Sequence, residues 1–94
     1  MNLRVEARAR DDLEQISLEG RRLFGPKQSS VYGAELKNAM SRLLDFPFAF
    51  PERTEFDPPV RVCRHKAHVI LYRVEGDTVL ILRVRHGRED WSAD

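Results

Sequence analysis

Two apolar runs near the C-terminal end of the chain most strongly limit what it can fold into. Residues 67–74 and 78–85 are rich in β-branched and aliphatic side chains, which is typical of strands. The connection between them, Glu75-Gly76-Asp77, is short and contains a glycine suited to a tight turn. The two runs therefore predict an antiparallel β-hairpin.

Two amphipathic helices are predicted before this hairpin. Apolar residues recur at steps of three and four between residues 9 and 23, and again on one face of residues 26–45. Gly25 and Pro26 separate the two stretches, because glycine suits the end of a helix and proline the first turn of the next. Prolines then interrupt residues 46–59, which predicts a loop. The two helices should form a tight helical hairpin.

Two shorter strands complete the predicted fold. Leu3 and Val5 alternate with polar residues, and Val60 and Val62 flank Arg61 in the same way. With only 94 residues, the chain has room for one packed core, so residues 1–94 are expected to form a single domain. The predicted order is β-α-α-β-β-β. This is an α+β fold with the helical hairpin on one face of a mostly antiparallel sheet and the other face open.

Composition excludes several classes of protein. Lys and Arg number 16 and Asp and Glu 15, and this balance excludes a strongly basic nucleic-acid coat protein and an acidic solvating segment. Cys63 is the single cysteine, which excludes an internal disulfide and a Cys-based zinc site. No apolar run approaches the roughly 20 residues of a membrane span. We therefore expect a cytoplasmic protein without membrane contact, cofactor or metal.

The basic residues are concentrated in the C-terminal third. Residues 60–88 hold seven Lys or Arg against two Asp or Glu. Arg83 and Arg85 are two positions apart in one predicted strand, so they should project from the same face of the sheet. Such a concentration of positive charge favours a surface that binds a partner, with arginine on a solvated face as the simpler alternative.

The last third also carries two specific motifs. The pattern H-x-I-x-Y-R occupies residues 68–73, and I-x-R-V-x-H-x-R-x-D occupies residues 81–90. Together with the order of helices and strands, these motifs resemble the ParE branch of the RelE/ParE toxin superfamily. The helix spacings agree with that branch, so the resemblance covers nearly the whole chain.

The resemblance implies a toxin of a type II toxin-antitoxin pair. Such a toxin inhibits DNA gyrase, blocks replication, arrests growth and serves plasmid stabilisation, while a ParD-like antitoxin binds it directly in a hetero-oligomer. Contact with nucleic acid would then be indirect, through gyrase or the antitoxin. We expect the antitoxin to add a helix or a strand, either at a free sheet edge or on the apolar surface of the helical hairpin, at Leu13, Ile16, Tyr32 and Leu36.

A RelE-like ribosome-dependent mRNA endonuclease is the main alternative. Cleavage of RNA needs groups that move protons, and RelE-like enzymes carry a Tyr or His near the C-terminus. In this chain that region is Glu89-Asp90-Trp91-Ser92-Ala93-Asp94, and the loop at residues 51–57 has more acids than bases. These features favour action by binding over catalysis. A third hypothesis is a toxin-derived protein that has lost its activity and acts only as a binding partner.

The target-binding region is predicted at the basic strands and the tail that follows them. A salt bridge between Arg88 and Asp90 is the competing structural role at that end. Trp91 either folds back onto the sheet or anchors another protein. The residues proposed for this region are Arg61, Arg73, Arg83, Arg85, His86, Arg88, Asp90 and Trp91.

Three further residues have simpler structural predictions. His68 alternates with Ile70 and Tyr72, so it is expected on the core side of the sheet with its ring nitrogens satisfied. Tyr72 should bury its ring and bond its hydroxyl at the rim. Cys63 is expected to be a small buried or edge residue without special reactivity.

Overall fold

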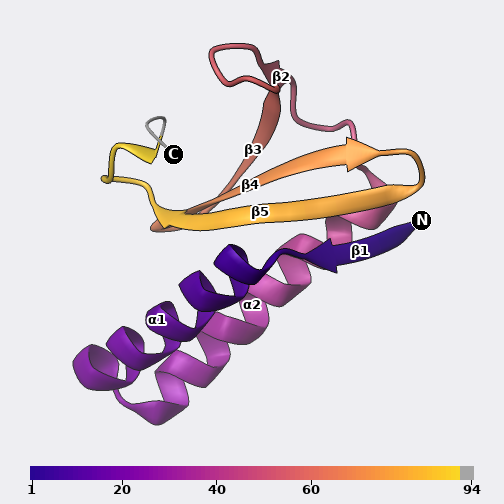
Figure 1. The fold of residues 1–94 in the computed structure, drawn as a ribbon. Helices are drawn as coiled ribbons and strands as arrows, with labels where there is room; N and C mark the ends of the chain where they lie inside the picture. Colours follow the sequence, from indigo (N-terminus) through magenta and orange to yellow (C-terminus); the bar gives the residue numbers. More distant parts are fainter. Residues whose placement is uncertain (92–94) are drawn as a thin grey trace.

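A computed structural model describes residues 1–91 as two helices packed on a five-stranded sheet. The elements are β1 (Asn2–Val5), α1 (Ala7–Phe24), α2 (Pro26–Asp45), β2 (Glu52–Arg53), β3 (Val60–His65), β4 (His68–Glu75) and β5 (Thr78–His86). The strand order is β1-β5-β4-β3-β2, with β1 parallel to β5 and all other neighbours antiparallel. The predicted α+β class, with a helical hairpin on one face of the sheet, is confirmed (Figure 1).

The helical hairpin turns where the sequence predicts. Gly25 adopts a φ of 87°, which favours glycine, and Pro26 occupies the first turn of α2. The two helices approach closely beyond the turn, since a Cβ on Gly20 would lie 2.9 Å from Ser29 Oγ. Ser29 Oγ also donates a hydrogen bond of 2.9 Å to the Ser17 carbonyl. Within residues 1–91, neither helix is long and apolar enough to cross a membrane.

One short strand was not predicted. β2 pairs antiparallel with β3, where Glu52 lies opposite Arg61 and Arg53 opposite Val60, inside the segment expected to be a loop. Two residues are too few to show an alternating pattern, so periodicity could not reveal this strand. The edges of the sheet are therefore β1 and β2, which have four and two residues.

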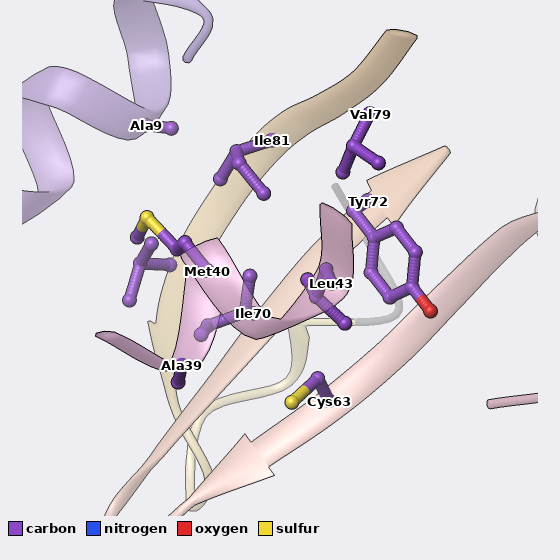
Figure 2. Packing of buried hydrophobic residues seen from close by; sticks show 10 residues of the cluster. Ala9, Ala39, Met40, Leu43, Cys63, Ile70, Tyr72, Val79 and Ile81 are labelled. Carbon is purple, nitrogen blue, oxygen red and sulfur yellow. The ribbon is translucent and has the colours of Figure 1, made fainter. Parts of the chain in front are cut away.

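The main core lies between the helices and the sheet (Figure 2). Tyr72 is fully buried there, and its hydroxyl donates a hydrogen bond of 2.9 Å to the Pro47 carbonyl, as predicted. Cys63 is also buried, and this desolvation raises the pKa of its thiol. The buried members of this core are Ala9, Ala39, Met40, Leu43, Cys63, Ile70, Tyr72, Val79, Ile81 and Val84.

The opposite face of the sheet is covered, so the prediction of an open face is wrong. A second apolar cluster lies there, formed by Phe56, Val60, Val69 and Leu71 with Val62, Leu82 and Trp91 packed against it. Trp91 stacks on Phe56 with ring centroids 6.0 Å apart and an interplanar angle of 2°. Of the two alternatives for Trp91, the structure shows the ring folded back onto the sheet. The last two strands are apolar at most positions, which is typical of strands buried on both faces, so the sequence did hold a signal for this cover.

An irregularity in the central hairpin decides which side chains face the helices. Tyr72 lies opposite Ile81, whereas the preceding Leu71 lies opposite Arg83. Leu82 is therefore an extra residue in β5, which is the arrangement of a β-bulge. Beyond this bulge, Leu71 lies on the face of the sheet that points away from the helices. Arg83 lies opposite Leu71, at a part of β5 that β1 does not cover, and its guanidinium reaches α1.

Candidate functional site

A groove of about 710 Å³ opens between the helical hairpin and the end of the sheet. The turn between β3 and β4 and the end of β5 form its polar end, while α1 and α2 form an apolar wall. The apolar side chains of the wall are those of Ile16, Leu23, Phe24 and Val31. The charged and aromatic polar side chains at the polar end are those of Tyr32, Glu35, Lys66, His68 and His86.

The apolar wall is largely exposed to solvent. Phe24 is 70% exposed, Leu23 54% and Val31 47%. Phe24 ends α1 and Val31 lies in α2, so the exposed side chains gather around the turn of the hairpin. Monomeric proteins seldom leave a contiguous apolar strip beside a groove unless another molecule covers it. This wall is therefore the candidate surface for binding a protein partner.

Three histidines meet at the polar end of the groove. His65 pairs with His68 across β3 and β4, and His68 pairs with His86 across β4 and β5. The rings of His68 and His86 have centroids 5.3 Å apart, and Tyr32 of α2 lies 5.4 Å from His68. His68 Nδ1 forms a hydrogen bond of 2.6 Å with the Tyr32 hydroxyl, which confirms the predicted position on the core side and a partner for this ring nitrogen.

Glu35 organises the charges beside this row. Its carboxylate lies 2.8 Å from Lys66 Nζ and 2.9 Å from His65 Nε2. The hydrogen bonds from Lys66 and then from His65 lower the pKa of Glu35. Among residues 1–91, no group of His, Cys, Asp and Glu side chains is arranged to hold a metal ion. The polar end is thus a hydrogen-bonded network that fixes the β3–β4 turn against α2.

The stability of the fold is expected to fall as the pH drops through the range where histidine titrates. Burial lowers the pKa of His68, and the charge on nearby His86 lowers it further, while Glu89 opposes this effect. The unfolded chain then binds more protons than the folded chain below the ordinary pKa of 6.5. Urea unfolding between pH 5.5 and 7.5, a range of about two units around that pKa, should show the loss. The variant His68→Gln should lose most of this pH dependence, and an unchanged pH slope in the variant would contradict the assignment to His68.

The four residues predicted to bind the antitoxin lie on the hairpin but differ in exposure. Leu13 and Ile16 are half-buried and pack against the main core. Tyr32 is half-buried at the polar end of the groove. Leu36 is 0% exposed, so it belongs to the interior and lies out of a partner's reach in this structure. Partner contact at Ile16 and Tyr32, which line the groove, stays a prediction.

Arg83, predicted to bind the target, forms a largely buried ion pair within the chain. Its Nε and Nη2 donate hydrogen bonds of 2.8 and 3.0 Å to the carboxylate of Asp12 in α1. The backbone N–H of Val84 donates a further hydrogen bond of 2.9 Å to the same carboxylate. The side chains of Arg83 and Asp12 are 14% and 16% exposed. Asp12 thus ties α1 to the part of β5 that lies beyond the pairing with β1.

The predicted shared face of Arg83 and Arg85 is confirmed by the sheet register. Arg83 lies opposite Leu71 and Arg85 opposite Val69, and both partners belong to the cluster on the face away from the helices. The four strand arginines do not form one surface, however, because Arg61 lies opposite the core residue Tyr72. The other three strand arginines also contact the chain itself, Arg61 at the Phe50 carbonyl, Arg73 at Glu75 and Arg85 at Glu89.

The segment after β5 forms a tight turn. Glu89 accepts hydrogen bonds from Arg85 at 2.8 Å and from the His86 N–H at 2.9 Å, and these contacts lower the pKa of Glu89 to about 2. The N–H of Arg88 donates a hydrogen bond of 3.1 Å to His86 Nδ1. The side chains of Arg88 and Asp90 are exposed. Among the contacts of residues 1–91, the Arg85–Glu89 ion pair is one that stabilises this turn.

Sequence reasoning missed three residues of these surfaces. Asp12 has a partner 71 positions away, and no local pattern marks such a pair. Phe24 lies next to the glycine that ends α1, and a large apolar residue at that position was a signal of an exposed contact. Arg64 was counted in the basic C-terminal third but was not selected, and the structure places it in the open on β3.

Comparisons with known proteins agree on one family. The family model described as "ParE toxin of type II toxin-antitoxin system, parDE" matches residues 3–91. Toxin ParE1 of Caulobacter vibrioides is 30% identical over 83 residues, covering 88% of this chain and 85% of that protein. Toxin ParE3 of the same organism is 29% identical over 82 residues, covering 87% and 82%. A solved structure, "Chromosomal ParDE TA system from P. aeruginosa", shares the fold with a TM-score of 0.81, at 23% identity over 92% of this chain and 95% of that one.

Proposed function

Because this chain belongs to the ParE toxin family of type II toxin-antitoxin systems, we propose that it inhibits DNA gyrase and so blocks replication. In this proposal a ParD-like antitoxin neutralises it by direct binding in a hetero-oligomer. The chain acts in the cytoplasm, where gyrase and DNA are found together, and unopposed activity arrests growth. The single observation that supports antitoxin binding best is the exposed apolar wall of the groove.

The antitoxin presents an amphipathic helix to this groove. Phe24 and Val31 offer apolar area that a helix can cover, and Lys66 and His68 offer polar contacts at the other end. Addition of a strand is the weaker alternative. The outer strands β1 and β2 have four and two residues, and they leave short parts of β5 and β3 uncovered. Asp12 already accepts a hydrogen bond from Val84 on the uncovered part of β5, so an added strand would gain few backbone hydrogen bonds at any of these edges.

Target binding is proposed at the turn that follows β5. Arg88 and Asp90 are exposed in this turn, close in sequence to His86. Trp91 follows this turn and stacks on Phe56, which fixes the end of the turn against the sheet. The residues after Arg88 include no Tyr or His, which favours inhibition by binding over cleavage of RNA.

The proposal is tested by adding the purified chain to a gyrase supercoiling assay. We expect supercoiling of relaxed plasmid to stop at a modest molar excess over gyrase, and to return when the cognate antitoxin is mixed with the chain first. A parallel reaction in a translating extract follows the integrity of messenger RNA. Persistent supercoiling together with cut messages would instead support the ribosome-dependent endonuclease. Harmless expression without the antitoxin would support an inactive toxin-derived partner.

A further inference from the structure

Arg64 of β3 lies against the backbone at the end of β5. A Cβ on Gly87 would lie 2.6 Å from Arg64 Nη1 and 3.2 Å from Nη2, so the guanidinium occupies the space that a side chain at position 87 would fill. Arg64 lies opposite Val69, which places it on the face of the sheet away from the helices and from the groove. The absence of a side chain at Gly87 therefore allows the Arg64 guanidinium to occupy this position.

Arg88 is held close to the same point. The N–H of Gly87 donates a hydrogen bond of 2.7 Å to the Ala67 carbonyl, and the N–H of Arg88 bonds to His86. The Cβ position at residue 87 is one C–C bond from the Gly87 Cα, and the Arg88 Cα lies about 3.8 Å from that Cα. Together with the 2.6 Å to Arg64 Nη1, these lengths place Arg64 Nη1 within roughly 8 Å of the Arg88 Cα. An arginine side chain covers such a distance when extended. The two guanidinium groups can therefore meet on one small anion.

The neighbouring carboxylate of Glu89 directs its hydrogen bonds to groups other than these two arginines. One oxygen of Glu89 accepts a hydrogen bond from Arg85, and the other accepts one from the His86 N–H. Among residues 1–91, neither Arg64 nor Arg88 takes part in an ion pair. Both side chains are exposed, so an approaching ligand meets two positive charges without displacing an internal partner.

We propose that Arg64 and Arg88 form a phosphate-binding site that contacts the phosphodiester backbone of nucleic acid. Guanidinium groups match phosphate oxygens through paired N–H donors, and two of them on one phosphate fix its position. The biological ligand rests on the proposed function, since gyrase holds DNA next to any inhibitor bound to it. The site itself is a property of the free chain. Contact with nucleic acid is then direct at this point, in place of the indirect contact predicted from the sequence.

The experiment measures binding of the free chain to a labelled short DNA duplex by fluorescence anisotropy at low salt. Arg64→Ala and Arg88→Ala should each weaken DNA binding by roughly fivefold. Each should also reduce the slope of the logarithm of the binding constant against the logarithm of the salt concentration by about one. Arg21→Ala is the matched control, because Arg21 is exposed in the last turn of α1, on the helical layer. The control should bind DNA as the unaltered chain does.

Gly87→Ala separates a positioned site from diffuse charge. The substitution keeps every charge, and the φ of Gly87 is not in the left-handed region, so an alanine can adopt this backbone conformation. Its Cβ would also lie 3.3 Å from the Ala67 carbonyl oxygen, which requires a small shift there. The added methyl group displaces the flexible end of Arg64, which lies 2.6 Å from that position. We expect a loss of DNA binding close to that of Arg64→Ala, with an unchanged circular dichroism spectrum and unchanged antitoxin binding.

The outcomes distinguish this site from the proposed function. Equal binding of duplex RNA, lost in the same variants, supports a site that recognises the phosphate and not the bases. Failure of the unaltered chain to bind either nucleic acid would overturn the site, as would equal affinities of Arg64→Ala and Arg21→Ala. Binding of an acidic peptide in place of nucleic acid would also overturn it. If the variants behave as expected but gyrase is not inhibited, the site stands and the proposed function fails.

Discussion

Replacing Asp12 by alanine is expected to lower the free energy of unfolding by about 3–5 kcal/mol. Asp12 accepts three hydrogen bonds, two from Arg83 and one from the N–H of Val84. In the variant, the Arg83 guanidinium, whose side chain is 14% exposed, loses this carboxylate. The N–H of Val84 at the strand edge loses its acceptor. A domain of this size has a total stability of about 5–15 kcal/mol, so the loss should be evident at 37 °C. Urea unfolding followed by circular dichroism measures it.

Asp11→Ala provides the matched control for this effect. Asp11 is exposed on the same turn of α1, so its replacement should change the stability by less than about 0.5 kcal/mol. The double variant Asp12→Leu with Arg83→Met should recover much of the loss, because a buried ion pair is replaceable by apolar side chains of similar volume. Equal urea midpoints for Asp11→Ala and Asp12→Ala would show that the ion pair does not hold α1 on the sheet.

The elements that the sequence predicted well are those specified by local signals. Gly25 and Pro26 restrict the backbone at the junction of the helices, and the structure has α2 at the predicted residues 26–45. The two runs around Gly76 also became β4 and β5, since alternation and a turn residue act within a few positions. Local preference and tertiary packing agree at these places.

The features that were missed depend on contacts between distant segments. The cover of the second sheet face requires Phe56 from a loop and Trp91 from beyond the last strand to meet over Val69. Neither residue carries a local signal for that meeting. The bulge at Leu82 likewise follows from how two strands fit together, and it changes which residues share a face.

The candidate site was predicted in part for the same reason. Alternation along one strand was sufficient to place His68 on the core side, but the meeting with His65 and His86 depends on the register of three strands. The positive charge of the last third was visible in the sequence, whereas the internal use of Arg83 was not. Charge counts locate a basic segment, and only the fold decides which of its side chains reach solvent.

The substitutions Phe24→Asp and Val31→Asp are each expected to weaken antitoxin binding by roughly 100-fold or more, the scale found for central apolar contacts at interfaces. Both side chains line the groove and are exposed, Phe24 by 70% and Val31 by 47%. A charge introduced there would be buried without a partner when the antitoxin covers the wall. The fold should tolerate the changes because neither residue contributes to the buried core. Biolayer interferometry with immobilised antitoxin measures the affinity.

Phe48→Asp is the matched control for these two variants. Phe48 is 65% exposed, nearly as much as Phe24, but it lies beyond α2 under the guanidinium of Arg61 and outside the groove. The same substitution there should leave antitoxin affinity within about twofold, as expected for a residue away from the interface. In cells, Phe24→Asp should arrest growth even when the antitoxin is co-expressed, because the variant keeps the turn after β5 but escapes neutralisation. If Phe48→Asp lost affinity while Phe24→Asp and Val31→Asp bound the antitoxin normally, the hairpin groove would not be the binding surface. The antitoxin would then bind at the opposite end of α2.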